Sequence, residues 1–171
     1  ATGIGTQHGG ILVDFNAVKG GIEIIPLDND WQRAAHVYSD EVLISHRTDA
    51  EKGTPKFERG KSLSDHQQEM IYISGTAAIR GEESIVTGDV LVQTEITLEN
   101  IQHLIGLEEG REKLPEHSGK LELLRVYLKH EEDAKIVKED MDKLCPDVPI
   151  VYLYADVCRE ELLVEIEGIA Y

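Results

Sequence analysis

The spacing of hydrophobic and polar positions changes along this 171-residue chain, and it is most regular after residue 68. Short apolar or alternating runs bounded by turn residues are typical of β-strands, and apolar positions recurring every three to four residues are typical of helices. The chain therefore predicts strands over 11–18, 21–25, 37–44, 70–77, 121–128, 150–157 and 162–170, and helices over 91–105 and 131–144.

The first predicted helix carries signals at both ends. Leu91, Leu98 and Ile105 recur at helical spacing, Asp89 precedes them as a candidate N-cap, and Gly106 follows the last turn. The helix is therefore expected to end close to residue 105.

The order of elements from residue 69 onward is strand, helix, strand, helix, strand, strand. This order favours an α+β fold, a mixed β-sheet with two helices packed on one face. The last two strands are expected to form a hairpin joined by the turn 158–161, and the segment 45–68 is expected to be a long loop or the edge of a domain. The other face of the sheet needs a cover, and the expected cover is another copy of the chain.

Charge narrows the range of partners. With 17 basic and 33 acidic residues, the formal net charge is −16. Nucleic acids and anionic membranes are held by Lys and Arg, so neither is an expected partner, whereas a small anionic molecule needs only a few local cations. No apolar run is long enough to span a membrane, and two cysteines fit the reduced thiols of a cytoplasmic protein.

No pattern predicts a metal or a nucleotide. The seven histidines form no ligand motif, since His66 and Glu69 have helical spacing but no second pair. The glycines near Gly3 and Gly9 are not followed by the lysine and helix of a phosphate-binding loop. We therefore expect neither a metal nor a cofactor.

Glu165 and Glu167 alternate with apolar residues on the last predicted strand and so share one face of it. Two neighbouring carboxylates raise each other's pKa, and burial raises it further, so one of the two could remain an acid near neutral pH. The alternative is that both belong to a solvent-facing acidic stripe on an edge strand.

Three separated segments, 72–77, 93–101 and 164–170, resemble motifs of the YjgF/Rid family in the right order. The resemblance covers residues 68–171 and implies a chorismate-mutase-like α+β fold and a homotrimer with ligand clefts between subunits. Residues 1–67 are then an N-terminal β-rich extension or the remnant of a preceding domain. The imine deaminases of this family have an arginine where this chain has Ile150, so ordinary deamination is not expected.

The closing segments 156–159 and 162–167 resemble those of the chorismatases, the chorismate-hydrolysing branch of the same fold. Residues 74–79, 55–59 and 1–6 are also similar to chorismatase segments. The resemblance implies that Glu165 and Cys158 lie in an active site and that Ala77 helps to decide the product. Chorismatases are about twice as long, so the chain is either a catalytic half or a short homologue with another substrate.

The substrate of a chorismatase is an anion, which needs cations and hydroxyl groups. By motif, Arg59 and Arg159 are the best placed arginines, although an arginine in an acidic chain is more often salt-bridged. Cys158 is expected to line the site rather than to act as a nucleophile. The other candidates for substrate binding are Thr76, Ala77, Tyr38 and Tyr152.

Together these features predict a chorismatase-like hydrolase that cleaves the enolpyruvyl ether of chorismate, or of a related enol ether, to pyruvate and a cyclohexadiene diol. Glu165 would be its general acid. The alternative is a non-catalytic trimeric module that binds a small carboxylate or regulates a pathway. A ribonuclease activity, sometimes attached to this family, fits poorly with the net charge of −16.

Overall fold

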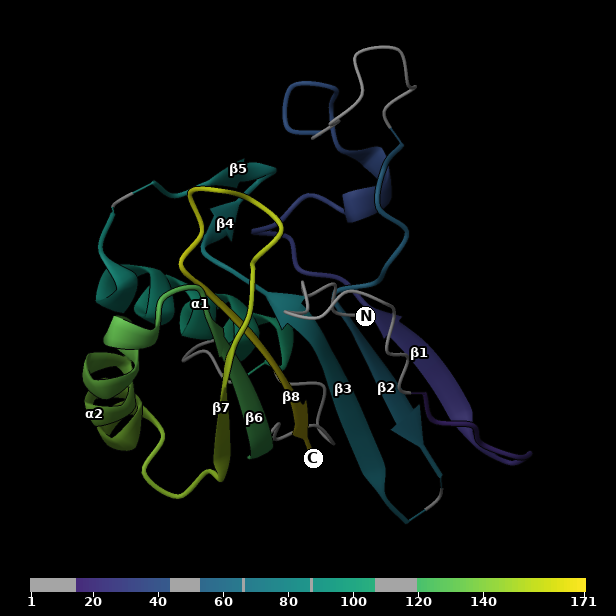
Figure 1. Cartoon of the computed structure of the whole chain (residues 1–171). Helices are drawn as coiled ribbons and strands as arrows, with labels where there is room; N and C mark the ends of the chain where they lie inside the picture. The colour runs from purple at the N-terminus through teal and green to yellow at the C-terminus, as the bar shows by residue number, and fades with distance from the viewer. Residues whose placement is uncertain (1–14, 44–52, 66, 87, 107–119) are drawn as a thin grey trace.

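The computed structural model describes residues 15–43, 53–65, 67–86, 88–106 and 120–171. Its main element is a six-stranded mixed sheet in the order β1-β2-β3-β8-β6-β7, which fans out across Figure 1. The strands are β1 (Glu23–Leu27), β2 (Gly60–Ser64), β3 (Glu69–Thr76), β6 (Leu121–Leu128), β7 (Ile150–Tyr154) and β8 (Val164–Ala170), with a separate hairpin of β4 (Ile79–Arg80) and β5 (Glu83–Ser84). The helices are α1 (Val90–Leu104) and α2 (Ala134–Leu144), with 3₁₀ turns at Ala35–Val37 and Glu131–Asp133.

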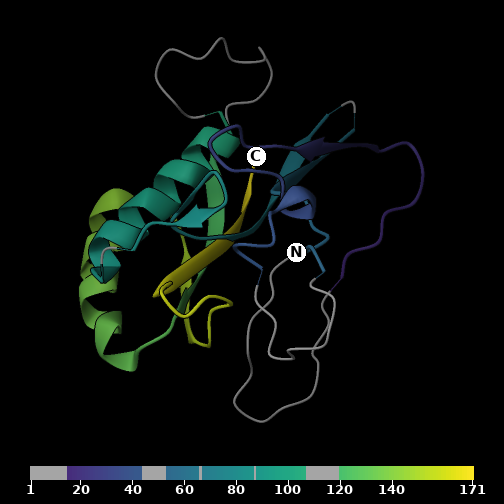
Figure 2. The same cartoon turned by 90° about the horizontal axis from the view of Figure 1, so that it is seen from above.

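Both helices pack on one face of the sheet, as the view from above shows (Figure 2), so the predicted α+β fold is confirmed. Leu124 and Ile166 of the sheet are fully buried together with Ile101 of α1 and Met141 of α2. The N-terminus of α1 is capped as predicted, because the Asp89 carboxylate accepts hydrogen bonds from two backbone N–H groups, at 2.9 and 3.3 Å.

The other face carries the alternate side chains of the same strands, and we call it the helix-free face. The antiparallel register of β6 and β8 places Tyr127 opposite Glu165 and Arg125 opposite Glu167. The residues directly before and after Glu165 point into the helix-covered core, so both glutamates project to the opposite side. Among the described residues, neither helix packs on this face.

The predicted hairpin of the last two strands is wrong. The chain runs from β6 through α2 into β7, which pairs with β6 in parallel at the edge of the sheet, while β8 inserts between β3 and β6. A helical crossover makes β7 parallel to β6, and β8 then pairs with the other edge of β6 instead of with β7. Glu165 therefore lies on a central strand.

The first third of the chain departs most from expectation. The predicted strand 21–25 is confirmed as β1, two residues further on, with Pro26 on an edge strand where its missing N–H costs least. The predicted strand 37–44 is wrong over 37–43, because a 3₁₀ turn at Ala35–Val37 is followed by coil and turn, and Tyr38 and Leu43 are buried in a small cluster; residue 44 lies outside the described residues. Residues 15–18 form no strand, and the rest of the strand predicted over 11–18 lies outside the described residues.

The predicted loop 45–68 contains β2, which the sequence pattern missed. Its inward positions are small, Gly60 and Ser62, so the strand has no apolar alternation. A Cβ at Gly60 would lie 3.1 Å from both the Leu104 side chain and the backbone oxygen of Tyr72, which explains why a small residue is needed. The proposed boundary at 67/68 falls between the paired strands β2 and β3, and the division into an extension and a domain stays a prediction.

Within the described ranges, no helix has the length and apolar character that crossing a membrane requires.

Candidate active site

Glu165 lies near the start of β8, between β3 and β6, with only 8% of its surface exposed. Burial raises the pKa of its carboxyl group to about 7, and the negative charge of Glu167 contributes to the rise. The alternative of a solvent-facing acidic stripe on an edge strand is therefore wrong for Glu165. Close to neutral pH this residue can hold and release a proton.

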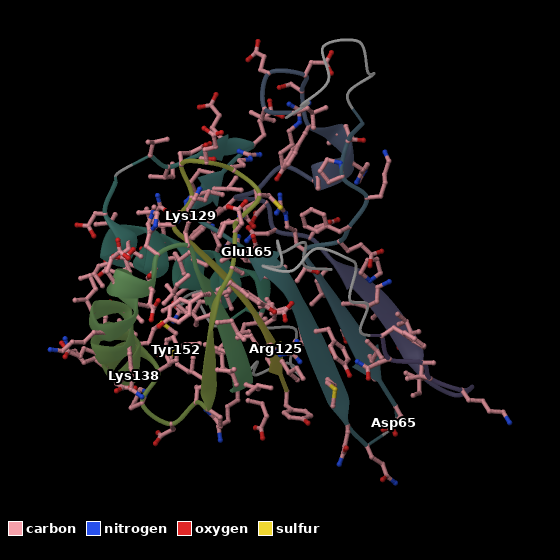
Figure 3. All side chains as sticks on the ribbon, in the orientation of Figure 1. Asp65, Arg125, Lys129, Lys138, Tyr152 and Glu165 are labelled. Atoms are coloured by element: carbon pink, nitrogen blue, oxygen red, sulfur yellow. The ribbon has the colours of Figure 1, made fainter. Side chains whose placement is uncertain are left out.

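Glu167 lies in a different environment, although only one residue separates it from Glu165. One of its carboxylate oxygens, Oε1, accepts a hydrogen bond from Arg125 Nη1 at 2.6 Å and another from the Tyr127 hydroxyl at 2.7 Å. Burial and the bond to Glu167 raise the pKa of Tyr127 to about 12, so the phenol stays a donor. Figure 3 labels Glu165 toward the upper end of the sheet and Arg125 lower down it, in agreement with the register that places Arg125 opposite Glu167.

Cys158 lies in the connection between β7 and β8, and its side chain is exposed. Partial desolvation and then the negative charge of Glu165 raise the pKa of the thiol. Cys158 is thus close enough to Glu165 to respond to its charge, and it is a neutral thiol at neutral pH. It has the character of a wall residue and not of an activated nucleophile.

Tyr38 joins two of the predicted arginines. The guanidinium carbon of Arg59 lies 5.8 Å from the centre of the Tyr38 ring, and that of Arg159 lies 5.4 Å from it. Arg33 completes this arginine cluster, because its backbone oxygen accepts a 2.8 Å hydrogen bond from Arg59 Nη2. Two guanidinium groups therefore lie by the Tyr38 ring, and Arg33 adjoins them through its backbone.

The members of the arginine cluster are engaged to different degrees. Arg33 forms a 3.0 Å ion pair with Glu82, and Nη1 of Arg159 donates to the backbone oxygen of Glu82 at 2.8 Å and to Ser84 at 3.0 Å. Arg59 is 3% exposed, and no carboxylate among the described residues pairs with it.

The Nε atom of Arg59 is buried and has no hydrogen-bond partner in the described part of the chain. A buried donor on a charged group destabilises the protein by several kilocalories per mole when it has no acceptor. An anion that accepts a hydrogen bond from it removes this cost, so this nitrogen favours a carboxylate ligand. The hydroxyl of Tyr38 accepts a hydrogen bond from Arg59 Nη2, which turns its own O–H toward a different acceptor. Together they form a candidate anion site.

A groove of about 710 Å³ runs over the helix-free side of β1, β2 and β3, beside the chain segment that carries Arg59. It reaches Tyr72 and Ser74 on β3, the strand that pairs with β8. The remaining lining residues are Phe15, Asn16, Val18, Ile24, His36, Lys56, Phe57, Glu58, Gly60, Lys61 and Leu63. Its apolar floor and mixed rim suit a small molecule with an apolar ring and charged groups.

The other predicted residues lie at different depths. Thr76 is buried, pairs with Ile166 in the sheet and donates its hydroxyl to the backbone oxygen of Ser74 at 2.9 Å. Ala77 is buried in a small cluster with Val157 and others, next to the connection that carries Cys158. Both therefore support the end of β3 from within.

Tyr152 lies on the opposite side of the sheet from Glu165. It packs against the core on the helix-covered side, and Lys138 of α2 lies 5.9 Å from its ring centre. Figure 3 shows Tyr152 and Lys138 together, away from Glu165. A role in substrate binding stays untested, and the proposals below do not use this residue.

Sequence analysis missed Arg125 and Tyr127. Both stand at alternate positions of a correctly predicted strand, which is a signal that they share a face. Their partner, Glu167, follows only from the register of β6 and β8, which the sequence does not specify. Among the residues that the structure describes, no three His, Cys, Asp or Glu side chains come together as metal ligands.

Comparison with known proteins identifies relatives of the chain. No family model matches the chain. It is 34% identical over 177 residues to a chorismatase of Streptomyces rapamycinicus, with 99% of this chain and 50% of that protein covered. This chain is a homologue of the chorismatases. A 3-hydroxybenzoate synthase of Streptomyces hygroscopicus is 33% identical, with 99% of this chain and 49% of that protein covered.

Solved structures give the same relationship. A chorismatase crystal structure superposes with a TM-score of 0.71 at 26% identity, covering 87% of this chain and 44% of that one. The YjgF gene product of E. coli shares the fold at 18% identity, with a TM-score of 0.52 and coverage of 67% and 87%. The predicted resemblance to YjgF proteins and chorismatases is therefore confirmed. The chain spans about half the length of the curated relatives it matches.

Proposed function

We propose that this chain carries a hydrolase site for the enolpyruvyl ether of chorismate, or of a closely related enol ether, with Glu165 as the general acid. The observation that carries the proposal is the buried Glu165 carboxyl group, whose pKa of about 7 keeps it protonated in a useful fraction of molecules at neutral pH. The homology to chorismatases supplies the substrate class.

The reaction balances with water as the only co-reactant. The Glu165 carboxyl group gives its proton to the terminal methylene carbon of the enolpyruvyl group, whose double bond supplies the electron pair. Water adds to the resulting oxocarbenium carbon and returns a proton to the Glu165 carboxylate. The hemiketal then collapses, its pyruvyl C–O bond breaks, the ring oxygen takes up the hydroxyl proton, and pyruvate and the diol leave.

The arginine cluster is the proposed anchor for a substrate carboxylate. Arg59 offers a buried donor at Nε, and Tyr38 offers its hydroxyl proton, so the two can hold one carboxylate by charge-assisted hydrogen bonds. Arg159 keeps Tyr38 in place and adds positive charge. The net charge of −16 repels an anionic substrate, and the cluster offsets this repulsion locally because it concentrates cations where an anion would enter.

Cys158 and Ala77 are proposed to shape the site and not to react. The neutral thiol of Cys158 stands near Glu165, and the methyl group of Ala77 fills a buried cluster at the end of β3. The similarity to chorismatases implies that a small residue at Ala77 helps to decide the product. Among the relatives, the names chorismatase and 3-hydroxybenzoate synthase show that more than one product occurs.

The pH dependence of turnover tests the assignment of the acid. Glu165 acts while it is protonated, so kcat for pyruvate release should be constant below pH 7 and fall as the pH rises above about 7. The free energy of unfolding should also fall as the pH rises through the folded-state pKa of Glu165, because that pKa is higher than the pKa of the same group in the unfolded chain. A coupled lactate dehydrogenase assay measures the rate, and a profile that rises above pH 7 would contradict the assignment.

We also propose that the chain assembles as a homotrimer, which the resemblance implies. The helix-free face supports this, because Val151 and Leu153 on the edge strand β7 are 46% and 38% exposed although they are large and apolar. Light scattering during size-exclusion chromatography should give three times the chain mass of 19.1 kDa. A monomer mass would contradict the proposal.

A further inference from the structure

Glu165 and Glu167 lie on the same face of β8, so one proton can reside on either carboxyl group. Glu165 and Glu167 are two residues apart on β8, so their side chains project to the same side at neighbouring positions. Where such groups interact, one proton is held by the pair, and its location depends on the surroundings of each carboxyl group. A general acid needs the proton on the residue that faces the substrate.

Residues of β6 make the surroundings of Glu165 and Glu167 different. Arg125 and Tyr127 stand opposite Glu167 and Glu165 in the register, yet both donate to the same oxygen of Glu167. A guanidinium and a phenol that donate to a carboxylate both favour its charged form. Tyr127 therefore lies opposite Glu165 in the sheet but donates its hydrogen bond to Glu167, and it stabilises the ionised state of Glu167.

We propose that Arg125 and Tyr127 are positioning residues, which hold Glu167 as a carboxylate and so leave the shared proton on Glu165. The catalytic meaning of this arrangement rests on the function proposed above, whereas the location of the proton does not. The raised pKa of Glu165 agrees with it, because the negative charge of Glu167 is one of its causes.

Other charged or titratable groups on this side of the sheet do not duplicate the arrangement. Lys129, directly after β6, donates to the backbone oxygen of Glu160 at 2.7 Å, and Lys61 on β2 pairs with Glu58 at 2.7 Å. The described groups that face the pair or its neighbourhood include Arg125 and Tyr127 of β6, Lys129 after it, Tyr72 of β3, Lys61 of β2, and Asp156, Cys158 and Arg159 of the β7–β8 connection.

The test is a substrate-free titration by nuclear magnetic resonance of protein labelled with carbon-13 at the glutamate side-chain carboxyl groups. Glu165→Gln and Glu167→Gln assign the two signals. In the wild-type chain, the Glu167 signal should remain that of a carboxylate while Glu165 titrates around pH 7. In the Arg125→Met/Tyr127→Phe double variant, both signals should move together, because the two glutamates then share the proton.

Control variants separate this effect from a general loss of charge or fold. Lys135→Met removes one positive charge from the exposed surface of α2 and should leave both titration curves unchanged. Arg125→Lys keeps the charge and should retain the wild-type order of titration. Tyr127→Phe alone should give a smaller mixing of the two curves if the double variant does not fold. A Glu167 signal that stays ionised through the Glu165 titration in the folded double variant, or in Tyr127→Phe where the double variant does not fold, would overturn the proposal.

Turnover separates this proposal from the proposed function. If two carboxyl groups share the proton equally, kcat in the double variant should fall by about twofold or more, with little change in KM. Mixed titration curves without any pyruvate release in the wild-type chain would support the positioning role and reject the hydrolase. Pyruvate release with unmixed curves would reject the positioning role alone.

Discussion

Glu165→Gln should lower kcat for pyruvate release from chorismate by on the order of 10²–10⁴-fold, the usual contribution of a positioned general acid. Glutamine keeps the size and the hydrogen-bonding capacity of the side chain but has no acidic proton to give. KM should change little, because the proposed carboxylate anchor lies at the arginine cluster. Steady-state kinetics of the purified variant measure both constants.

The matched control is Glu160→Gln, which makes the same chemical change at an exposed glutamate in the β7–β8 connection. Its kcat should equal that of the wild type. The Glu165→Gln variant should also be at least as stable as the wild type above pH 7, since it removes a buried carboxyl group that ionises there. Equal kcat values for Glu165→Gln and the wild type would remove the general acid from the mechanism.

Arg59→Met should raise KM for chorismate about tenfold or more, because a hydrogen bond to a charged group is worth about 1.5–3 kcal/mol. Methionine retains part of the apolar packing against Phe57, which lies 5.2 Å from the guanidinium carbon, but it loses every donor. A carboxylate should gain most binding free energy at this site, because the Nε atom is buried and has no partner among the described residues. The measurement is KM together with the dissociation constant of benzoate.

Arg80→Met is the control for Arg59→Met, because Arg80 also lies over an aromatic ring, that of Trp31 at 4.7 Å, but outside the arginine cluster. It should leave KM unchanged. Arg59→Lys retains the charge and should recover part of the affinity, which would separate binding from packing. An unchanged KM in a folded Arg59→Met chain would place the carboxylate elsewhere.

Much of the sheet and both helices were predictable because their residues carry strong periodic signals. β6 alternates buried and less buried positions from Leu124 to Leu128, and Asp89 and Gly106 bracket α1. β2 was missed because its inward residues are small, and the final hairpin was wrongly predicted because strand pairing depends on the crossover and not on the local pattern.

The candidate site was predictable in part for the same reasons. Alternation placed Glu165 and Glu167 on one face, and motif similarity selected Arg59, Arg159 and Cys158. The difference between the two glutamates needs the register of β6 and β8, which brings Arg125 and Tyr127 to Glu167. Residues 40 and 42 positions apart along the chain make these contacts, so no local pattern reports them.

The central claim is that Glu165 protonates the enolpyruvyl group, so that water attacks the pyruvyl carbon and leaves the ring carbon untouched. Hydrolysis of chorismate by the wild-type chain in water enriched in oxygen-18, followed by mass spectrometry of the products, tests this most directly. The account predicts pyruvate together with a diol that retains only unlabelled oxygen. Oxygen-18 in the diol, or binding of chorismate without release of pyruvate, would contradict it.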